Sequence, residues 1–142
     1  MTPTDAAIRD LLLNTRRIAL VGASDRADRP SHGVMRFLIA RGYDVTPVNP
    51  TLPGRAIHGI PVAASLDAAA PLDLVDIFRR SSEAGAVVDE AIRLNAKAVW
   101  MQLGVIDDAA ADRARAAGLA VVMDRCPAIE WRRLGLPDRV AP

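Results

Sequence analysis

The 142-residue sequence is poor in the residue types that build metal and disulfide sites. It has one cysteine, Cys126, so it cannot form an internal disulfide or an all-cysteine zinc site. Its only histidines, His32 and His58, are too few to favour a histidine-rich metal site. Aromatic residues make up 4% of the chain, so the core must be built from Val, Ile, Leu and Ala.

The sequence also lacks a strong net charge and a long apolar run. The net charge is +1 at pH 7, which gives no support for nucleic acid or a membrane surface as a partner. No apolar run approaches the ~18 residues that span a bilayer, and the N-terminus lacks a secretion-signal pattern. We therefore expect a cytoplasmic protein with neither partner. The length predicts a single domain, 1–142, with a loose tail at 137–142.

Segments of strand and helix character alternate along the chain. Strands are predicted at 17–21, 43–48, 74–78, 98–102 and 119–123. Helices are predicted at 4–13, 30–42, 81–95, 107–118 and 128–134, with one helical turn at 65–70 and a loop at 51–61. The strands are apolar throughout, which is typical of strands buried on both faces. The fold class predicted is α/β: a five-stranded, mostly parallel, doubly wound sheet with helices on both faces and strand order 2-1-3-4-5.

The segment 17–31 joins a buried strand to a helix through a small-residue turn. The N–H groups at such a helix start lack intrahelical partners, and the helix dipole favours negative charge there. Arginines in the turn add charge-assisted donors. The residues that make this pattern are Gly22, Ala23, Ser24, Arg26, Arg29, Pro30 and Ser31. They indicate a nucleotide-phosphate site; the alternative is an ordinary turn that binds nothing.

The other strands end in residues that packing alone does not require. Ligands of doubly wound sheets bind beyond the carboxyl ends of the strands, so we expect these residues to gather at one rim. They are Asn49 and Pro50, Phe78 with Arg79 and Arg80, Gln102 and Gly104, and Cys126. Two adjacent arginines at such a rim favour an anion, and Gln102 needs a polar partner.

Several common sites are disfavoured by missing motifs. A dinucleotide site needs G-x-G-x-x-G and an acidic residue at the end of the second strand, where this chain has Asn49. No Walker-type phosphate loop and no G-x-S-x-G elbow is present. Carboxylates at the predicted rim are few, which leaves little for acid–base catalysis.

The strings VGAS, RPSHGV, VTPVNP, VDIFRR, AVWMQLGV and VVMDRCPAIE occur in this order between about residues 18 and 130. Together they resemble the small stand-alone coenzyme A-binding proteins, which are similar to the N-terminal CoA-binding domain of the succinyl-CoA synthetase α-subunit. The resemblance implies a Rossmann-like fold and CoA as the cofactor. The phosphate-carrying histidine of the synthetase belongs to a different domain, so the resemblance implies binding and not turnover.

The resemblance also implies a role for each rim residue. It implies that Gly22, Ala23 and Ser24 with the Arg26 loop cradle phosphate, and that Val48, Asn49 and Pro50 line the nucleotide end. It further implies that Ile77, Phe78 and Arg79 flank the ligand with Arg80 close by, and that Gln102 and Gly104 meet the pantetheine arm.

Three functions follow from these patterns. The first is a non-catalytic module that binds CoA or a short acyl-CoA, with a regulatory role and a protein partner or a second copy of itself. The alternatives are one subunit of a split acyl-CoA ligase and an NAD(P)-binding oxidoreductase fragment.

Cys126 is hypothesised to form a mixed disulfide with the CoA thiol, with Arg125 favouring its thiolate. The alternative is a small buried residue before Pro127.

Overall fold

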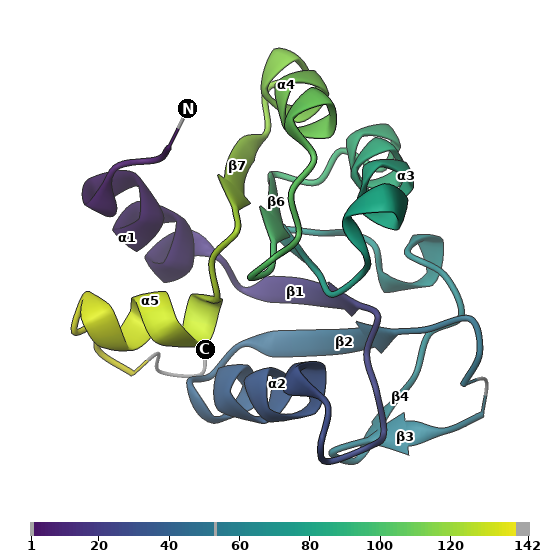
Figure 1. The fold of residues 1–142 in the computed structure, drawn as a ribbon. Helices are drawn as coiled ribbons and strands as arrows, with labels where there is room; N and C mark the ends of the chain where they lie inside the picture. The colour runs from purple at the N-terminus through teal and green to yellow at the C-terminus, as the bar shows by residue number, and fades with distance from the viewer. Residues whose placement is uncertain (1, 53, 139–142) are drawn as a thin grey trace.

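A computed structural model describes residues 2–52 and 54–138. At its centre lies a five-stranded sheet with the order β2-β1-β5-β6-β7, in which every neighbouring pair is parallel. The strands are β1 (Arg17–Val21), β2 (Asp44–Val48), β5 (Leu74–Ile77), β6 (Ala98–Met101) and β7 (Ala120–Met123). These are the first to the fifth strand of the sheet in chain order. The predicted α/β fold class and the predicted strand order 2-1-3-4-5 are therefore confirmed (Figure 1).

Helices cover both faces of this sheet. The helices are α1 (Asp5–Asn14), α2 (Pro30–Ala40), α3 (Ser81–Arg93), α4 (Asp108–Ala116) and α5 (Pro127–Arg133), with a 3-10 turn at Asp67–Ala69. Side chains of α3 and α4 pack with one set of strand residues, and side chains of α1, α2 and α5 pack with the other set. No helix in the part of the chain that the structure describes is both long and apolar enough to cross a membrane.

The core is aliphatic on both sides of the sheet, and strand residues alternate between its two halves. Val75 and Ile77 belong to the half under α3 and α4, whereas Leu74 belongs to the half under α1, α2 and α5. Trp100 is the largest fully buried side chain and lies in the second half. Burial of this much apolar surface is the main driving force for the fold.

The segment 51–61 differs from the loop predicted for it. It contains a small antiparallel hairpin, β3 (Ala56–Ile57) and β4 (Ile60–Pro61), with the left-handed residues His58 and Gly59 between the strands. Two-residue strands are too short to show an alternating pattern, so no sequence signal predicts them.

Smaller differences lie at the ends of elements. The strands predicted at 74–78 and 98–102 each end one residue earlier. Of the tail predicted to be loose, 139–142 lie outside the described residues, while the Asp138 carboxylate pairs with Arg41 at 2.7 Å.

Candidate functional site

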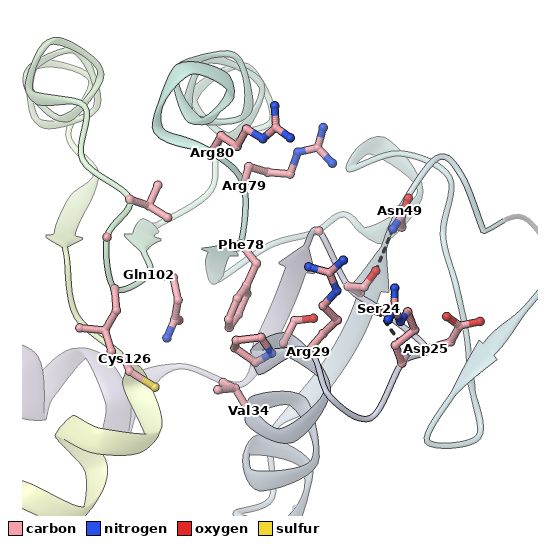
Figure 2. Close-up of a pocket in the computed structure, with 18 of the residues that line it drawn as sticks. Ser24, Asp25, Arg29, Val34, Asn49, Phe78, Arg79, Arg80, Gln102 and Cys126 are labelled. Atoms are coloured by element: carbon pink, nitrogen blue, oxygen red, sulfur yellow. Dashed lines mark hydrogen bonds between the residues drawn. The ribbon is translucent and has the colours of Figure 1, made fainter.

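One pocket of about 860 Å³ lies beyond the carboxyl ends of β1, β2, β5 and β6, against the start of α2 (Figure 2). It brings together most of the residues predicted for a site. Those that line it are Gly22, Ala23, Ser24, Arg26, Ser31, Asn49, Phe78, Arg79, Arg80, Gln102, Gly104 and Cys126. The expected gathering of separate strand ends at one rim is therefore what the structure shows.

Three predicted residues, Val48, Pro50 and Ile77, do not line the pocket. Val48 and Ile77 are buried in the half of the core under α3 and α4. Successive strand side chains point to opposite faces, and these two take the face away from the pocket. Pro50 is exposed after the end of β2.

Other lining residues were missing from the predicted set. They are Asp25, Val34, Thr51, Leu52, Leu103 and Val105, whereas Arg29 and Pro30, which also line the pocket, belong to the segment predicted to bind phosphate. Val34 could have been found, because it lies one helical turn after Pro30 and so shares its face of α2. Thr51 and Leu52 follow β2 in a loop with no periodic pattern, so no sequence signal marked them.

The turn after β1 is held by backbone bonds. The N–H groups of Gly22 and Ala23 both donate to the carbonyl oxygen of Val48, at 3.0 and 3.4 Å. These two donors are therefore already used within the protein. The start of α2 has no side-chain cap, but Pro30 has no N–H and the N–H of His32 donates to the carbonyl oxygen of Arg29 at 3.0 Å. Of the first three residues of this helix, Ser31 therefore has the one backbone N–H without a partner among the described residues.

The arginines around this end of the pocket differ in their pairing. Arg79 pairs with Glu83 at 2.6 Å, and Arg26 pairs weakly with Asp28 at 3.4 Å. Within residues 2–52 and 54–138, Arg29 and Arg80 form no ion pair. Arg29 and Arg80 are therefore two cations that line the pocket without a paired carboxylate. Such unpaired cations create a local positive potential that attracts an anion.

The opposite end of the pocket is apolar, with two exceptions. Gln102 and Cys126 line this end, and Figure 2 shows Phe78 and Val34 between them and the arginines. Gln102 is only 6% exposed, and its Oε1 atom has no hydrogen-bond partner among the described residues. A buried acceptor without a donor is costly, so Gln102 places an unsatisfied polar group at the wall of the pocket.

Two histidines join the hairpin to α2 beside the pocket. The rings of His32 and His58 have centroids 4.2 Å apart, and His58 Nε2 lies 2.8 Å from the carbonyl oxygen of His32. Burial lowers the pKa of His32, and the neighbouring His58 lowers it further. No group of three or more His, Cys, Asp or Glu side chains that could hold a metal ion occurs in the described ranges.

Comparison with known proteins gives three findings. Residues 16–132 match the model of a family described as CoA binding domain. The chain is 37% identical over 124 residues to the protein YneT of Bacillus subtilis (strain 168), covering 87% of this chain and 91% of that one. A solved structure of a hypothetical protein from Pyrococcus horikoshii OT3 is 36% identical with a TM-score of 0.88, covering 94% of each chain.

A more distant likeness concerns a larger enzyme. The apo form of the dinucleotide-forming acetyl-coenzyme A synthetase 1 from Ca. Korarchaeum cryptofilum superposes with a TM-score of 0.69 at 21% identity. The superposition covers 81% of this chain but 27% of that enzyme. At this identity the likeness shows a shared fold alone.

Proposed function

The chain belongs to the CoA-binding domain family, and from this premise we propose that it binds CoA or a short acyl-CoA in the pocket at the strand ends. We propose further that it acts as a non-catalytic binding or regulatory module. The observation that carries the proposal is that one pocket joins a cationic end at Arg29 to an apolar end at Gln102.

The cationic end suits the phosphates of CoA. CoA carries a diphosphate and a 3′-phosphate, and Arg29 and Arg80 offer charge-assisted donors that no described carboxylate occupies. The uncapped start of α2 adds the backbone N–H of Ser31 and a favourable dipole. Arg79 can serve as well if it exchanges Glu83 for a phosphate.

The apolar end suits the pantetheine arm. This arm is long and uncharged, with two amide groups, and it fits a groove whose wall includes Phe78 and Val34. An amide N–H of the arm supplies the donor that Gln102 Oε1 lacks. The ligand therefore matches both ends of the pocket in charge and in hydrogen bonding.

Isothermal titration calorimetry with CoA, dephospho-CoA, NAD and NADP tests the proposal. We expect CoA to bind, dephospho-CoA to bind more weakly because it lacks the 3′-phosphate, and the two nicotinamide nucleotides to bind far more weakly or not at all. Binding of NAD in preference to CoA would contradict the proposal and favour an oxidoreductase fragment.

A pair of arginine variants tests the placement of the phosphates. Arg29→Gln removes a charge that lines the pocket, and we expect it to weaken CoA binding by about 1–3 kcal/mol, or roughly 5- to 150-fold. Arg113→Gln is the matched control, since Arg113 lies on α4 outside this pocket and pairs with Asp89 at 2.9 Å. Equal affinity for the two variants would remove Arg29 from the site.

A further inference from the structure

Cys126 is the only cysteine of the sequence, and it lines the apolar end of the pocket. The residue is 6% exposed and forms no disulfide. Its sulfur lies near the side chain of Gln102 in Figure 2. Any chemistry between a protein thiol and a ligand in this pocket must therefore occur at this one atom.

The loop that carries Cys126 is fixed to the neighbouring strand. The indole N–H of Trp100 donates to the carbonyl oxygen of Arg125 at 2.8 Å. The N–H of Gly104 donates to Asp124 Oδ1 at 2.7 Å, and Asp124 itself has a φ of 59°. The fully buried Trp100 thus anchors the residue directly before the cysteine. The position of the thiol is set by β6, the strand that also leads into Gln102.

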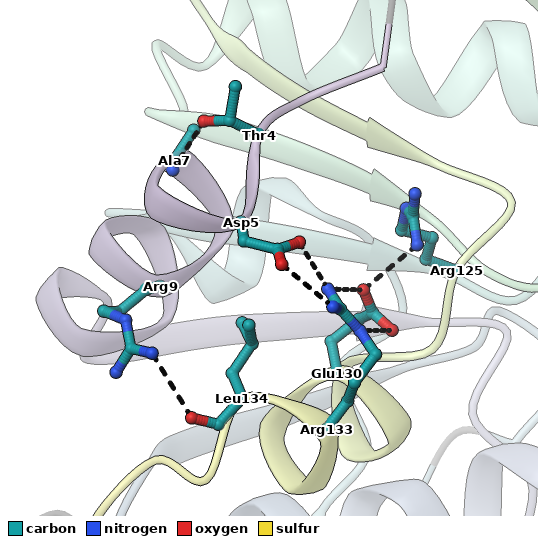
Figure 3. A network of polar contacts seen from close by, with 8 residues as sticks. All are labelled: Thr4, Asp5, Ala7, Arg9, Arg125, Glu130, Arg133 and Leu134. Atoms are coloured by element: carbon teal, nitrogen blue, oxygen red, sulfur yellow. Dashed lines mark hydrogen bonds and ion pairs between the residues drawn. The ribbon is translucent and has the colours of Figure 1, made fainter.

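A network of charges holds the other side of the loop (Figure 3). Glu130, which is 3% exposed, accepts from Arg125 at 3.1 Å and from Arg133 at 2.9 Å. Arg133 also bonds Asp5 in α1. The charge of Arg125 is therefore balanced by Glu130.

Gln102 provides the second, independent observation. Its Oε1 atom is buried and lacks a donor, and it belongs to the same end of the pocket as the cysteine. In CoA the last amide N–H is separated from the sulfur by two carbon atoms. An N–H donated to Gln102 therefore leaves the ligand sulfur within a short reach of the pocket wall that holds Cys126.

We propose that Cys126 undergoes thiol–disulfide exchange with the sulfur end of a CoA-type ligand; this rests on the function proposed above. The Cys126 thiol first gives its proton to water. The resulting thiolate attacks one sulfur of CoA disulfide, a new S–S bond forms between Cys126 and CoA, and the original S–S bond breaks. The second CoA leaves as a thiolate and takes up a proton. The disulfide is the oxidant, so no other reagent is needed.

Intact-mass measurement of the wild-type protein tests the exchange. The protein is incubated with CoA disulfide or, in a parallel arm, with glutathione disulfide at the same concentration. We expect one CoA adduct per chain, reversed by a reducing thiol and formed at least 10-fold faster than the glutathione adduct. Excess acetyl-CoA, which has no free thiol and cannot reduce a disulfide, is expected to slow the formation of the glutathione adduct, because both reagents then need the same pocket. Cys126→Ser assigns the adduct and must carry none.

Calorimetry on the same wild-type protein under reducing conditions separates this inference from the proposed function. If CoA binds but no adduct forms on Cys126, the exchange is refuted and the binding function stands. The same holds if glutathione disulfide reacts as fast as CoA disulfide and acetyl-CoA gives no protection. If CoA does not bind, the proposed function fails and the exchange fails with it.

Discussion

The side-chain amide of Asn49 donates a hydrogen bond to the carbonyl oxygen of Ala23, 2.8 Å away, and so ties the end of β2 to the turn after β1. The Oδ1 atom of the same amide accepts from the backbone N–H and the hydroxyl of Thr51, at 2.9 and 2.7 Å. Asn49 lines the pocket, but its side chain is already used within the protein. Its contribution to the site is to fix the pocket wall.

Asn49→Ala is therefore expected to lower both stability and affinity. Loss of these bonds is expected to reduce the free energy of unfolding by about 1–2 kcal/mol and to weaken CoA binding. Urea denaturation and calorimetry measure the two effects. Asn14→Ala is a suitable control, since Asn14 is exposed at the end of α1 and a change there is expected to stay within about 0.5 kcal/mol. Wild-type stability of Asn49→Ala would contradict this role.

Gly22 is required by the approach of two strands. It has a φ of 87°, and a Cβ atom at this position would lie 2.0 Å from the carbonyl oxygen of Phe78. We expect Gly22→Ala to lower the free energy of unfolding by about 2–4 kcal/mol, from the left-handed backbone and the clash together. Because the neighbouring backbone leaves no room at this turn, a side chain at position 22 is expected to distort it. We therefore expect ligand binding to fall as well.

Gly33→Ala is the matched control for this substitution. Gly33 lies inside α2, is exposed, and has no atom within 4 Å of the position a Cβ would take. Alanine is the better helix former, so we expect a gain of about 0.5–1 kcal/mol. Thermal denaturation of both variants measures the contrast. A Gly22→Ala protein as stable as Gly33→Ala would show that the turn tolerates a side chain.

The strand order and the place of the pocket could be predicted because they depend on long apolar runs and on the residues that follow them. The faces of the strands could not be predicted in the same way. In β5 all four residues are buried, including Asp76, so polarity gives no sign of which side chains face the pocket. Nothing in the strand pattern therefore corrected the placement of Ile77 at the site, which the family resemblance had implied.

Contacts between distant segments were also beyond the sequence pattern. The bond from Trp100 to Arg125 and the pairing of Glu130 with two arginines depend on how α5 packs on the sheet. A buried glutamate at the start of a short helix looks from the sequence like an exposed first-turn acid. The alternative that the chain is one subunit of a split acyl-CoA ligase stays a prediction, and so does the loose tail at 137–142.

Glu130 is expected to be the most sensitive charged residue of α5. Glu130→Gln leaves Arg125 and Arg133 facing a neutral amide in a partly buried place, and we expect a loss of about 1–3 kcal/mol in the free energy of unfolding. Asp5→Asn removes only the exposed partner of Arg133, and a much smaller loss is expected. Chemical denaturation compares the two. Similar losses would show that burial of Glu130 does not set its contribution.

Asp76 is a fully buried carboxyl in β5, and neither of its oxygens has a hydrogen-bond partner within the described part of the chain. It lies two residues before Phe78, and its nearest neighbours across the sheet are Leu20 and Trp100. Burial in this apolar setting raises the pKa of Asp76 well above its ordinary value. The carboxyl is therefore protonated in the folded protein at pH values where it is ionised in the unfolded chain.

This difference in pKa makes stability fall as the pH rises. Below about pH 4 both states hold the proton, and the contribution of Asp76 is fully present. Above about pH 4 only the folded state holds the proton on Asp76. The free energy of unfolding therefore decreases by up to about 1.4 kcal/mol per pH unit until the folded carboxyl ionises. Asp76→Asn replaces the titrating carboxyl with an amide and leaves the other titrating groups in place. Urea denaturation from pH 4 to pH 8 measures the free energy of unfolding of both proteins. We expect the value for the wild type minus the value for the variant to decrease as the pH rises. A constant difference would mean that Asp76 is ionised in the fold, with its charge balanced by a partner or by water.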